Sequence, residues 1–162
     1  MMKIISGGQT GADEAGLEAA IRVGFETGGT APKNYKTLIG SNYNLKERYK
    51  LDESESFNYA DRTYENVKNS DGTLRLAYNF SSRGEKCTLK AIRKYTKPYY
   101  DIDLSEPIDP TITARWIMGH GIEILNIAGN ANRGDNTVIY DECLKYLIEV
   151  FNELKRLQND LF

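Results

Sequence analysis

Apolar residues along this chain form short runs that alternate with longer stretches of helical spacing. The short runs predict strands, at 2–6, 25–30, 73–79, 98–102 and 122–128. Apolar positions three and four residues apart predict helices after 11, over 61–68, over 86–95, from 110 to 119 or 121, and over 138–161. Strands that alternate with helices are typical of α/β proteins, so we expect a mainly parallel sheet with helices on both faces.

Two helix starts carry capping signals, and one long segment carries no periodicity. Asp109 followed by Pro110 is an N-cap with proline at the first helical position. Thr10 is expected to cap the first helix, with Asp13 three residues later. The segment 33–59 is polar and poorly periodic, and long excursions of this kind in compact domains are often functional.

Composition describes one globular domain over residues 1–162, and it excludes several classes of function. Hydrophobic residues make up 40% and charged residues 27%, while the net charge of −2 argues against a nucleic-acid partner. The two cysteines and the single His120 form no metal-ligand pattern, and reduced thiols fit a cytoplasmic protein. We see neither a signal peptide nor an apolar run of bilayer length, so no membrane partner is expected.

Four loops rich in Gly, Ser, Thr or Asn follow predicted strands or lie close to their ends, at 6–11, 28–33, 79–84 and 129–134. In open parallel sheets, ligands bind beyond the carboxyl ends of the strands, so these loops are expected to meet at one edge. The first loop leads into a helix, where free N–H groups can hold a phosphate. No loop matches the Walker or the G-x-G-x-x-G pattern.

Charged residues beside these loops are candidates for the polar groups of a site. Arg83 and Arg133 could pair with a phosphate, or could be solvated. Asp13 is either a charge at a helix N-terminus or a ligand contact. Glu85 and Asp71 are the candidate catalytic residues, Glu85 as a general base. We interpret the basic positions of the next helix as a solvated face, namely Lys86, Lys90, Arg93, Lys94 and Lys97.

Several motifs together resemble a known family. The following segments appear in the order typical of that family: IISGGQTGADEAGLEAA, GGTAPK at 28–33, YKLDE at 49–53, RT-NV-SDGTL between 62 and 74, KP at 97–98 and LNIAG at 125–129. They are similar to the circularly permuted YpsA branch of the SLOG superfamily, whose members are also called molybdenum carriers. The similarity spans almost the whole chain.

This resemblance implies a three-layer Rossmann-like fold of about five strands and a pocket for a nucleotide-derived ligand. It assigns ligand contacts to Gly7, Gly8, Gln9, Thr10, Arg62, Asn66, Ser70, Asp71 and Thr73. Thr73 would then begin its strand at the ligand edge. The loops at Ser82–Arg83 and Gly129–Asn130, with Arg133, complete the candidate site.

The chain also departs from the family pattern at four places. Glu14 stands where the family has arginine, and Ser82-Arg83-Gly84-Glu85 stands where it has a glycine-rich GGT element. The family's AGPR is replaced by 129–133, and its later Pro-Gly by 135–136. Arg83 and Arg133 are the basic residues that could compensate.

Three functional hypotheses follow. The first is a binding protein for a nucleotide or nucleotide-derived ligand, acting as sensor, carrier or sequestering protein rather than as an enzyme. The second is an N-glycosidic hydrolase of nucleoside monophosphates, whose PGGxGTxxE motif in related LOG proteins is missing here. The third is a carrier of molybdenum cofactor or molybdate. The long C-terminal helix favours a homo-oligomer in each case.

Overall fold

The computed structural model describes residues 2–160 and confirms the three-layer α/β architecture. Five parallel strands form the central sheet in the order β2-β1-β9-β7-β8. They are β1 (Lys3–Ile5), β2 (Glu26–Gly28), β7 (Gly72–Ala77), β8 (Tyr99–Asp103) and β9 (Ile124–Gly129). Each lies within two residues of a predicted run, except that the second run, 25–30, extends past β2 into a separate short strand.

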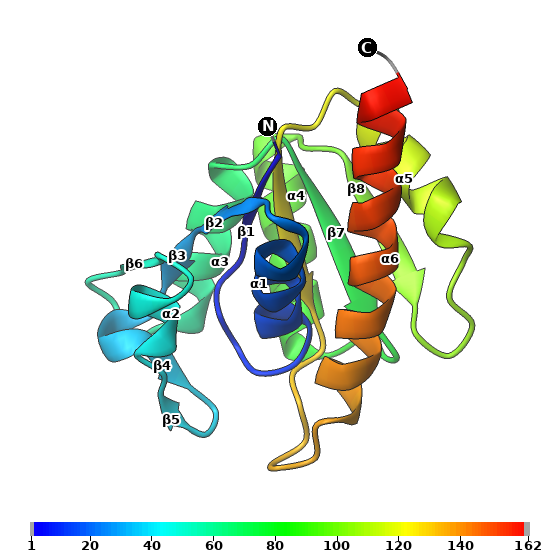
Figure 1. The fold of residues 1–162 in the computed structure, drawn as a ribbon. Coiled ribbons are helices and arrows are strands. Elements are labelled where there is room, and N and C mark those ends of the chain that lie inside the picture. The colour runs from blue at the N-terminus through cyan, green and yellow to red at the C-terminus, as the bar shows by residue number, and fades with distance from the viewer. Residues whose placement is uncertain (1, 161–162) are drawn as a thin grey trace.

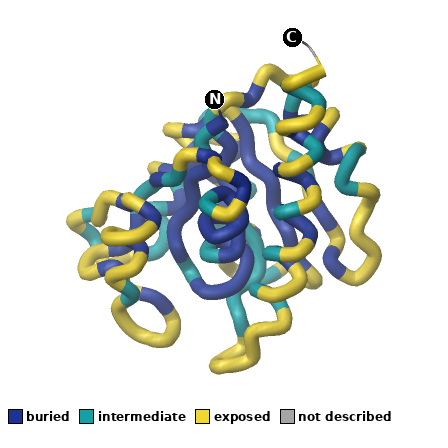
Figure 2. Tube along the Cα trace, viewed as in Figure 1, coloured by how far each residue is buried: buried dark blue, intermediate teal, exposed yellow. Residues whose placement is uncertain are grey.

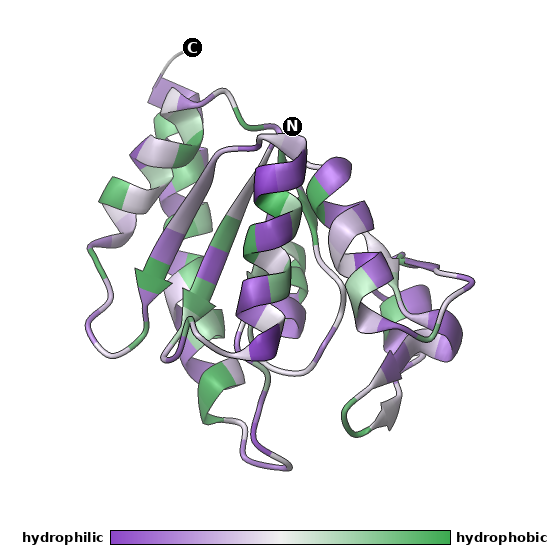
Figure 3. Cartoon of the chain, turned by 180° about the vertical axis from the view of Figure 1, so that it is seen from behind, coloured by the Kyte–Doolittle hydropathy of each residue, from purple (hydrophilic) through white to green (hydrophobic). Residues whose placement is uncertain are grey.

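Helices cover both faces of this sheet. Three helices lie on the face toward the viewer in Figure 1: α1 (Ala12–Val23), α5 (Pro110–Gly119) and α6 (Val138–Asp160). Of these, α6 packs against both α1 and α5. The other face carries α3 (Tyr59–Lys68) and α4 (Arg83–Tyr95), which pack together and appear in front in Figure 3 with many hydrophilic residues on their outer sides.

The main hydrophobic core lies between the sheet and the first of these helix layers. Apolar residues of β1, β7 and β9 meet Phe151 and Leu147 of α6, which are fully buried. The tube in Figure 2 is dark blue along these central elements. Polar and apolar residues alternate along β7, and its polar residues are buried as well as its apolar ones. Arg75 is 3% exposed and makes two hydrogen bonds to Asp101, of 2.7 and 2.6 Å.

The polar segment after β2 folds into a small unit of its own beside α1 (Figure 1). It contains two short strand pairs, β3 (Thr30–Ala31) with β6 (Asp52–Glu53), and β4 (Lys36–Thr37) with β5 (Gly40–Ser41). A short 3-10 helix (Lys33–Tyr35) and α2 (Asn44–Glu47) complete it. Leu17 of α1 packs with Leu45, Tyr49 and Leu51 in a second apolar cluster, so this polar segment still has a core.

The two capping predictions have different outcomes. Asp109 caps α5 as expected, because its side chain accepts the Thr111 N–H at 2.8 Å. The prediction for Thr10 is wrong: Gly11, with a φ of 91°, is the N-cap of α1 and no side chain caps it. A Cβ at Gly11 would lie 2.4 Å from the Asn130 carbonyl oxygen, so this close approach of two loops requires glycine.

The burial of Phe151 makes a stability prediction. Its ring lies 5.6 Å from that of Phe25, and Phe151→Ala should lower the free energy of unfolding by about 3–5 kcal/mol through lost contacts and a cavity. Phe57→Ala is the matched control, since Phe57 is 51% exposed and its loss should cost roughly 0.5 kcal/mol. Urea denaturation of the two variants measures this difference, and equal losses would contradict the packing described.

Candidate functional site

The loops that follow β1, β7 and β9 meet at one edge of the sheet, which is the lower edge in Figure 1. They meet because parallel strands place their carboxyl ends on the same side. An open cleft of about 1420 Å³ lies over this edge. Nine residues that the sequence placed in a site line it. Three lie near the starts of α1 and α3 (Gln9, Asp13, Arg62), three at the start of α4 (Ser82, Arg83, Glu85), and three after β9 (Gly129, Asn130, Arg133).

The first glycine loop is not an empty anion cradle. The Gln9 N–H donates to the Asp13 carboxylate at 3.3 Å, the Thr10 N–H to the Gln9 side chain at 3.0 Å, and the Gly8 N–H to Ser6 at 3.3 Å. Its glycines make room for protein side chains. A Cβ at Gly7 would lie 2.5 Å from Arg62. Three N–H groups of this loop are therefore used within the protein, while those of Gly7 and Gly11 have no hydrogen-bond partner among residues 2–160.

Asp13 and Arg62 form the inner end of the cleft. Their charged groups are 3.8 Å apart, and the side chains are 7% and 12% exposed. Arg62 also donates to Thr63 at 2.7 Å, but its buried Nε has no partner among residues 2–160. Burial raises the pKa of Asp13 to about 6; Arg62 and the Gln9 N–H oppose the rise, and Glu85 adds to it. A carboxylate that changes charge near neutral pH thus faces the cleft.

Behind this pair lies a cavity of about 10 Å³, bordered by Gly7, Asp13, Arg62 and Asn66, among others. It has room for about one water molecule. Asn66 is 2% exposed and pairs with the backbone of Thr30 through both its amide groups, at 2.8 and 2.9 Å. Asn66 therefore joins α3 to β3, and its side chain is committed to the fold.

Glu85 and Asn130 are held together in the middle of the cleft. The Asn130 side chain donates to Glu85 at 3.0 Å and accepts the N–H groups of Tyr78 and Asn79 at 2.9 and 3.1 Å. Ser82 also hydrogen-bonds to the Glu85 carboxylate. Glu85 is 3% exposed as a residue, so its carboxylate is fixed rather than solvated.

The start of α4 is the cationic part of the cleft. Arg83, Lys86 and Lys90 line it from successive turns of this helix. Sequence reasoning assigned Lys86 and Lys90 to a solvated face, although their four-residue spacing from the Ser82 loop could have placed them on the cleft side. Within 2–160, the N–H groups of Arg83 and Gly84 have no hydrogen-bond partner, and the space beside Gly84 is open.

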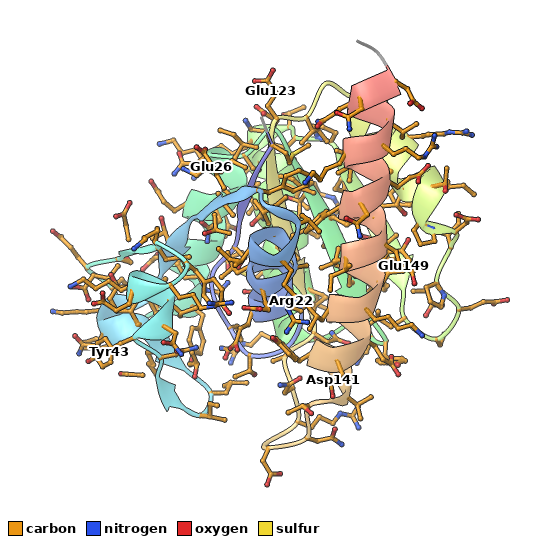
Figure 4. All side chains as sticks on the ribbon, viewed as in Figure 1. Arg22, Glu26, Tyr43, Glu123, Asp141 and Glu149 are labelled. Carbon is orange, nitrogen blue, oxygen red and sulfur yellow. The ribbon has the colours of Figure 1, made fainter. Side chains whose placement is uncertain are left out.

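Ser70, Asp71 and Thr73 are not brought to this cleft. Thr73 pairs with Asn126 near the amino end of β7, so it begins its strand as expected, but at the end away from this cleft. Asp71 accepts the N–H groups of Glu123 and Ile124, at 3.1 and 2.8 Å. Figure 4 shows Glu123 at the top of the molecule and Asp141, from the start of α6, at the bottom. Asp71 thus caps the amino edge of β9.

In the first loop only Gln9 lines the cleft, and the predicted contacts Gly7, Gly8 and Thr10 do not. Gly8 is buried under Leu45, which a Cβ at Gly8 would approach to 2.6 Å. Thr10 is 4% exposed, and its Oγ1 has no partner among residues 2–160. Across that same range there is no group of three or more His, Cys, Asp or Glu side chains placed to hold a metal ion. No helix within it is both long and apolar enough to cross a membrane.

The raised pKa of Asp13 predicts a pH dependence of stability. Above pH 6 the folded protein holds an ionised, buried Asp13, whereas the unfolded chain has a pKa of 3.8. Stability should therefore rise as the pH falls through 6, by roughly 1 kcal/mol between pH 7.5 and 5. Asp13→Asn should lack this gain. Urea denaturation of both proteins at the two pH values tests this, and equal pH dependence would contradict the assignment.

Comparisons with known proteins agree with this architecture. Residues 4–151 match the Circularly permutated YpsA SLOG family. A crystal structure of a Syntrophus aciditrophicus SB protein, named "Putative molybdenum carrier protein", is similar over 93% of this chain and 94% of that chain, with 38% sequence identity and a TM-score of 0.80. No curated protein matches. The chain belongs to the circularly permuted YpsA SLOG family.

Proposed function

We propose that this chain is a cytosolic protein that binds a nucleotide or nucleotide-derived phosphorylated ligand in the cleft, and acts as a sensor, carrier or sequestering protein. The family supports small-molecule binding in general. The observation that carries the finer proposal is the start of α4, where unpaired N–H groups of Arg83 and Gly84 stand beside Lys86 and Lys90 in an open cleft. N–H groups at a helix N-terminus and cationic side chains are the donors that bind phosphate.

The proposed phosphate position differs from the one expected for the first loop. Asp13 already accepts the Gln9 N–H, and a phosphate there would meet its negative charge. At α4 the helix dipole and the side chains of Arg83 and Lys86 attract an anion together. Glu85 is the opposing charge nearby, but Asn130 and Ser82 stabilise it, so it does not need the ligand.

A second candidate ligand is molybdate or the phosphate of molybdenum cofactor. The specific observation in its favour is the name of the Syntrophus neighbour. Cations and N–H groups at α4 suit a molybdenum oxyanion as well as a phosphate. Molybdate therefore belongs among the ligands to be tested, and metal analysis of protein purified from a molybdenum-replete host would compare it with the nucleotides.

Catalysis is a further candidate because of Glu85. This carboxylate is buried, lines the cleft and is oriented by Asn130, as a general base must be. If the chain hydrolyses the N-glycosidic bond of nucleoside monophosphates, it should release free base from AMP, and Glu85→Gln should abolish the release. Stable AMP in the presence of the protein would leave the binding role alone.

The proposal also includes a homo-oligomer formed through α6. This helix, Val138–Asp160, lies in the helix layer in front of the sheet in Figure 1. Sedimentation of the purified protein would measure the subunit number.

Ligand binding through α4 makes a direct prediction. A ligand screen by thermal shift should include AMP, ATP, NAD, ADP-ribose, cyclic nucleotides and molybdate. A ligand at 100 times its Kd should add about 2.7 kcal/mol of stability. Arg83→Ala should weaken that ligand about tenfold, because a charge-assisted contact is lost. Arg93→Ala is the matched control: Arg93 is exposed on the same helix but does not line the cleft. Equal affinities of the two variants would exclude α4 as the binding element.

A further inference from the structure

The central sheet ends in an open strand. β8 is the last strand in the order β2-β1-β9-β7-β8, so it has a strand neighbour on one side only. Its ladder with β7 begins at the Pro98 C=O and ends at the Leu104 N–H, which each make a bond of 3.0 Å to that strand. Because alternate residues of a strand bond to the same neighbour, the even-numbered residues of β8 face β7. The backbone groups of the odd-numbered residues therefore point away from the sheet, at Tyr99, Asp101 and Asp103.

These outward backbone groups are available for pairing. All three residues are exposed, and their N–H groups donate to no other residue among 2–160. In the same range the C=O groups of Tyr99 and Asp101 accept no bond, while that of Asp103 accepts the Glu106 N–H at 3.1 Å. An open strand edge of this kind is a template for pairing with another strand.

The charge in the middle of this edge is already neutralised. Charged side chains on an edge strand usually prevent pairing with another chain. Asp101, however, forms an ion pair of 2.6 Å with Arg75 of the neighbouring strand β7, and Arg75 is buried. The centre of the edge therefore presents no unpaired carboxylate to an approaching strand.

Apolar side chains beside the edge are uncovered as well. Tyr100, in the middle of β8, packs on Trp116 of α5 with ring centroids 5.3 Å apart, and both rings are only partly buried. Ile112 lies one helical turn before Trp116 on the same side of α5 and is 46% exposed. Figure 1 shows β8 and α5 on the right of the molecule. We call Tyr99–Asp103, Ile112 and Trp116 together the β8 edge surface.

We infer that the β8 edge surface binds a second copy of this chain, with the two β8 strands antiparallel. The sequence around β8 is self-complementary in one register, in which Tyr100 lies at the two-fold axis. Tyr99 then lies opposite Asp101 of the second copy, and their outward N–H and C=O groups bond to each other. Lys97 lies opposite Asp103 of the second copy, so opposite charges meet. The contact is isologous and joins two sheets into one.

Other registers fit less well. If one strand moves by two residues, Asp101 of each copy faces Asp101 of the other, and like charges directly opposite are destabilising. If it moves by two residues the other way, Asp103 faces Tyr95, which belongs to α4 and cannot join a strand ladder. A shift by one residue sets the outward groups of one strand against residues whose own groups face β7.

This contact is independent of the ligand and of the contact through α6. The β8 edge surface contains no residue of α6, and none of its residues lines the cleft. Pairing through β8 can therefore fail while ligand binding stands, and the reverse also holds. The two oligomer contacts use separate surfaces, so one does not exclude the other.

Charge reversal tests the register. Lys97→Glu alone or Asp103→Lys alone should weaken association about tenfold, because like charges then meet across the contact. The two changes together should restore most of the affinity, since opposite charges face each other again. Sedimentation of the full chain over a range of concentrations measures the association. A double variant that associates more weakly than either single variant would overturn the register.

A charge on α5 tests the apolar part of the surface. Ile112→Glu should halve the size of the oligomer, because a carboxylate would be buried in the contact without a partner. Ile39→Glu is the matched control: Ile39 is 70% exposed between β4 and β5 and should leave the oligomer unchanged. Both residues are exposed, so both variants should fold, which circular dichroism would verify. Equal association of the two variants would refute the β8 edge surface as the contact.

A disulfide at the axis tests the geometry. Opposite residues that share no backbone bonds have Cα atoms about 4.5 Å apart, within the range of a disulfide. Tyr100→Cys should therefore form a covalent dimer under mild oxidation, whereas the wild-type chain with Cys87 and Cys143 should not. Glu149→Cys is the control on α6, where Glu149 is exposed (Figure 4).

Two results would overturn the inference as a whole. A covalent dimer of Glu149→Cys without one of Tyr100→Cys would place the copies against α6 instead of β8. A wild-type chain that stays monomeric at every concentration accessible to sedimentation would exclude the pair altogether, and it would leave the proposed ligand binding untouched.

Discussion

The arrangement of the cleft depends on Asn130, which follows the central strand β9. Its backbone N–H donates to Leu76 at 3.0 Å, and its carbonyl oxygen accepts the Ala12 N–H at 3.0 Å. The side chain adds bonds to the loop after β7 and to Glu85. One residue thus joins the start of α1 to the ends of β7 and β9, and the order of strands in the sheet makes this possible. All its polar groups are used within the protein, so Asn130 shapes the site rather than supplying a free contact to a ligand.

In the first loop, too, a buried polar group is paired within the protein. Burying the carboxylate of Asp13 without partners would be costly, and Gln9 and Arg62 reduce this cost. In return, Asp13 satisfies one of the loop N–H groups that a phosphate would otherwise bind. The structure therefore places a negative charge at the loop that most resembles the family pattern, whereas the start of α4 combines unpaired N–H groups with cationic side chains.

The sequence predicted the layers well, because periodicity reports the faces that the sheet and helices bury. It could not predict the fold of 33–59, where Leu45 and Leu51 are buried by packing against α1 rather than by a local pattern. It also could not show that Asp71 and Thr73 lie away from the cleft, because a motif read along the chain does not tell which end of a strand a residue occupies. Only the pairing of β7 with β9 does so. Lys86 and Lys90 are exposed, as a solvated face predicts, but spacing along a helix does not tell that this face borders a cleft.

The departures from the family pattern change where charged residues lie around the cleft. Glu14 replaces a basic residue at the start of α1, and its carboxylate accepts a hydrogen bond from Asn42 of the excursion, at 3.4 Å. That contact, together with the bond from Leu38 to Gln9, holds the excursion against the first loop. Meanwhile Arg83 brings a cation to the start of α4. Positive charge in the cleft thus lies at the start of α4, whereas the first turn of α1 carries the acidic residues Asp13 and Glu14.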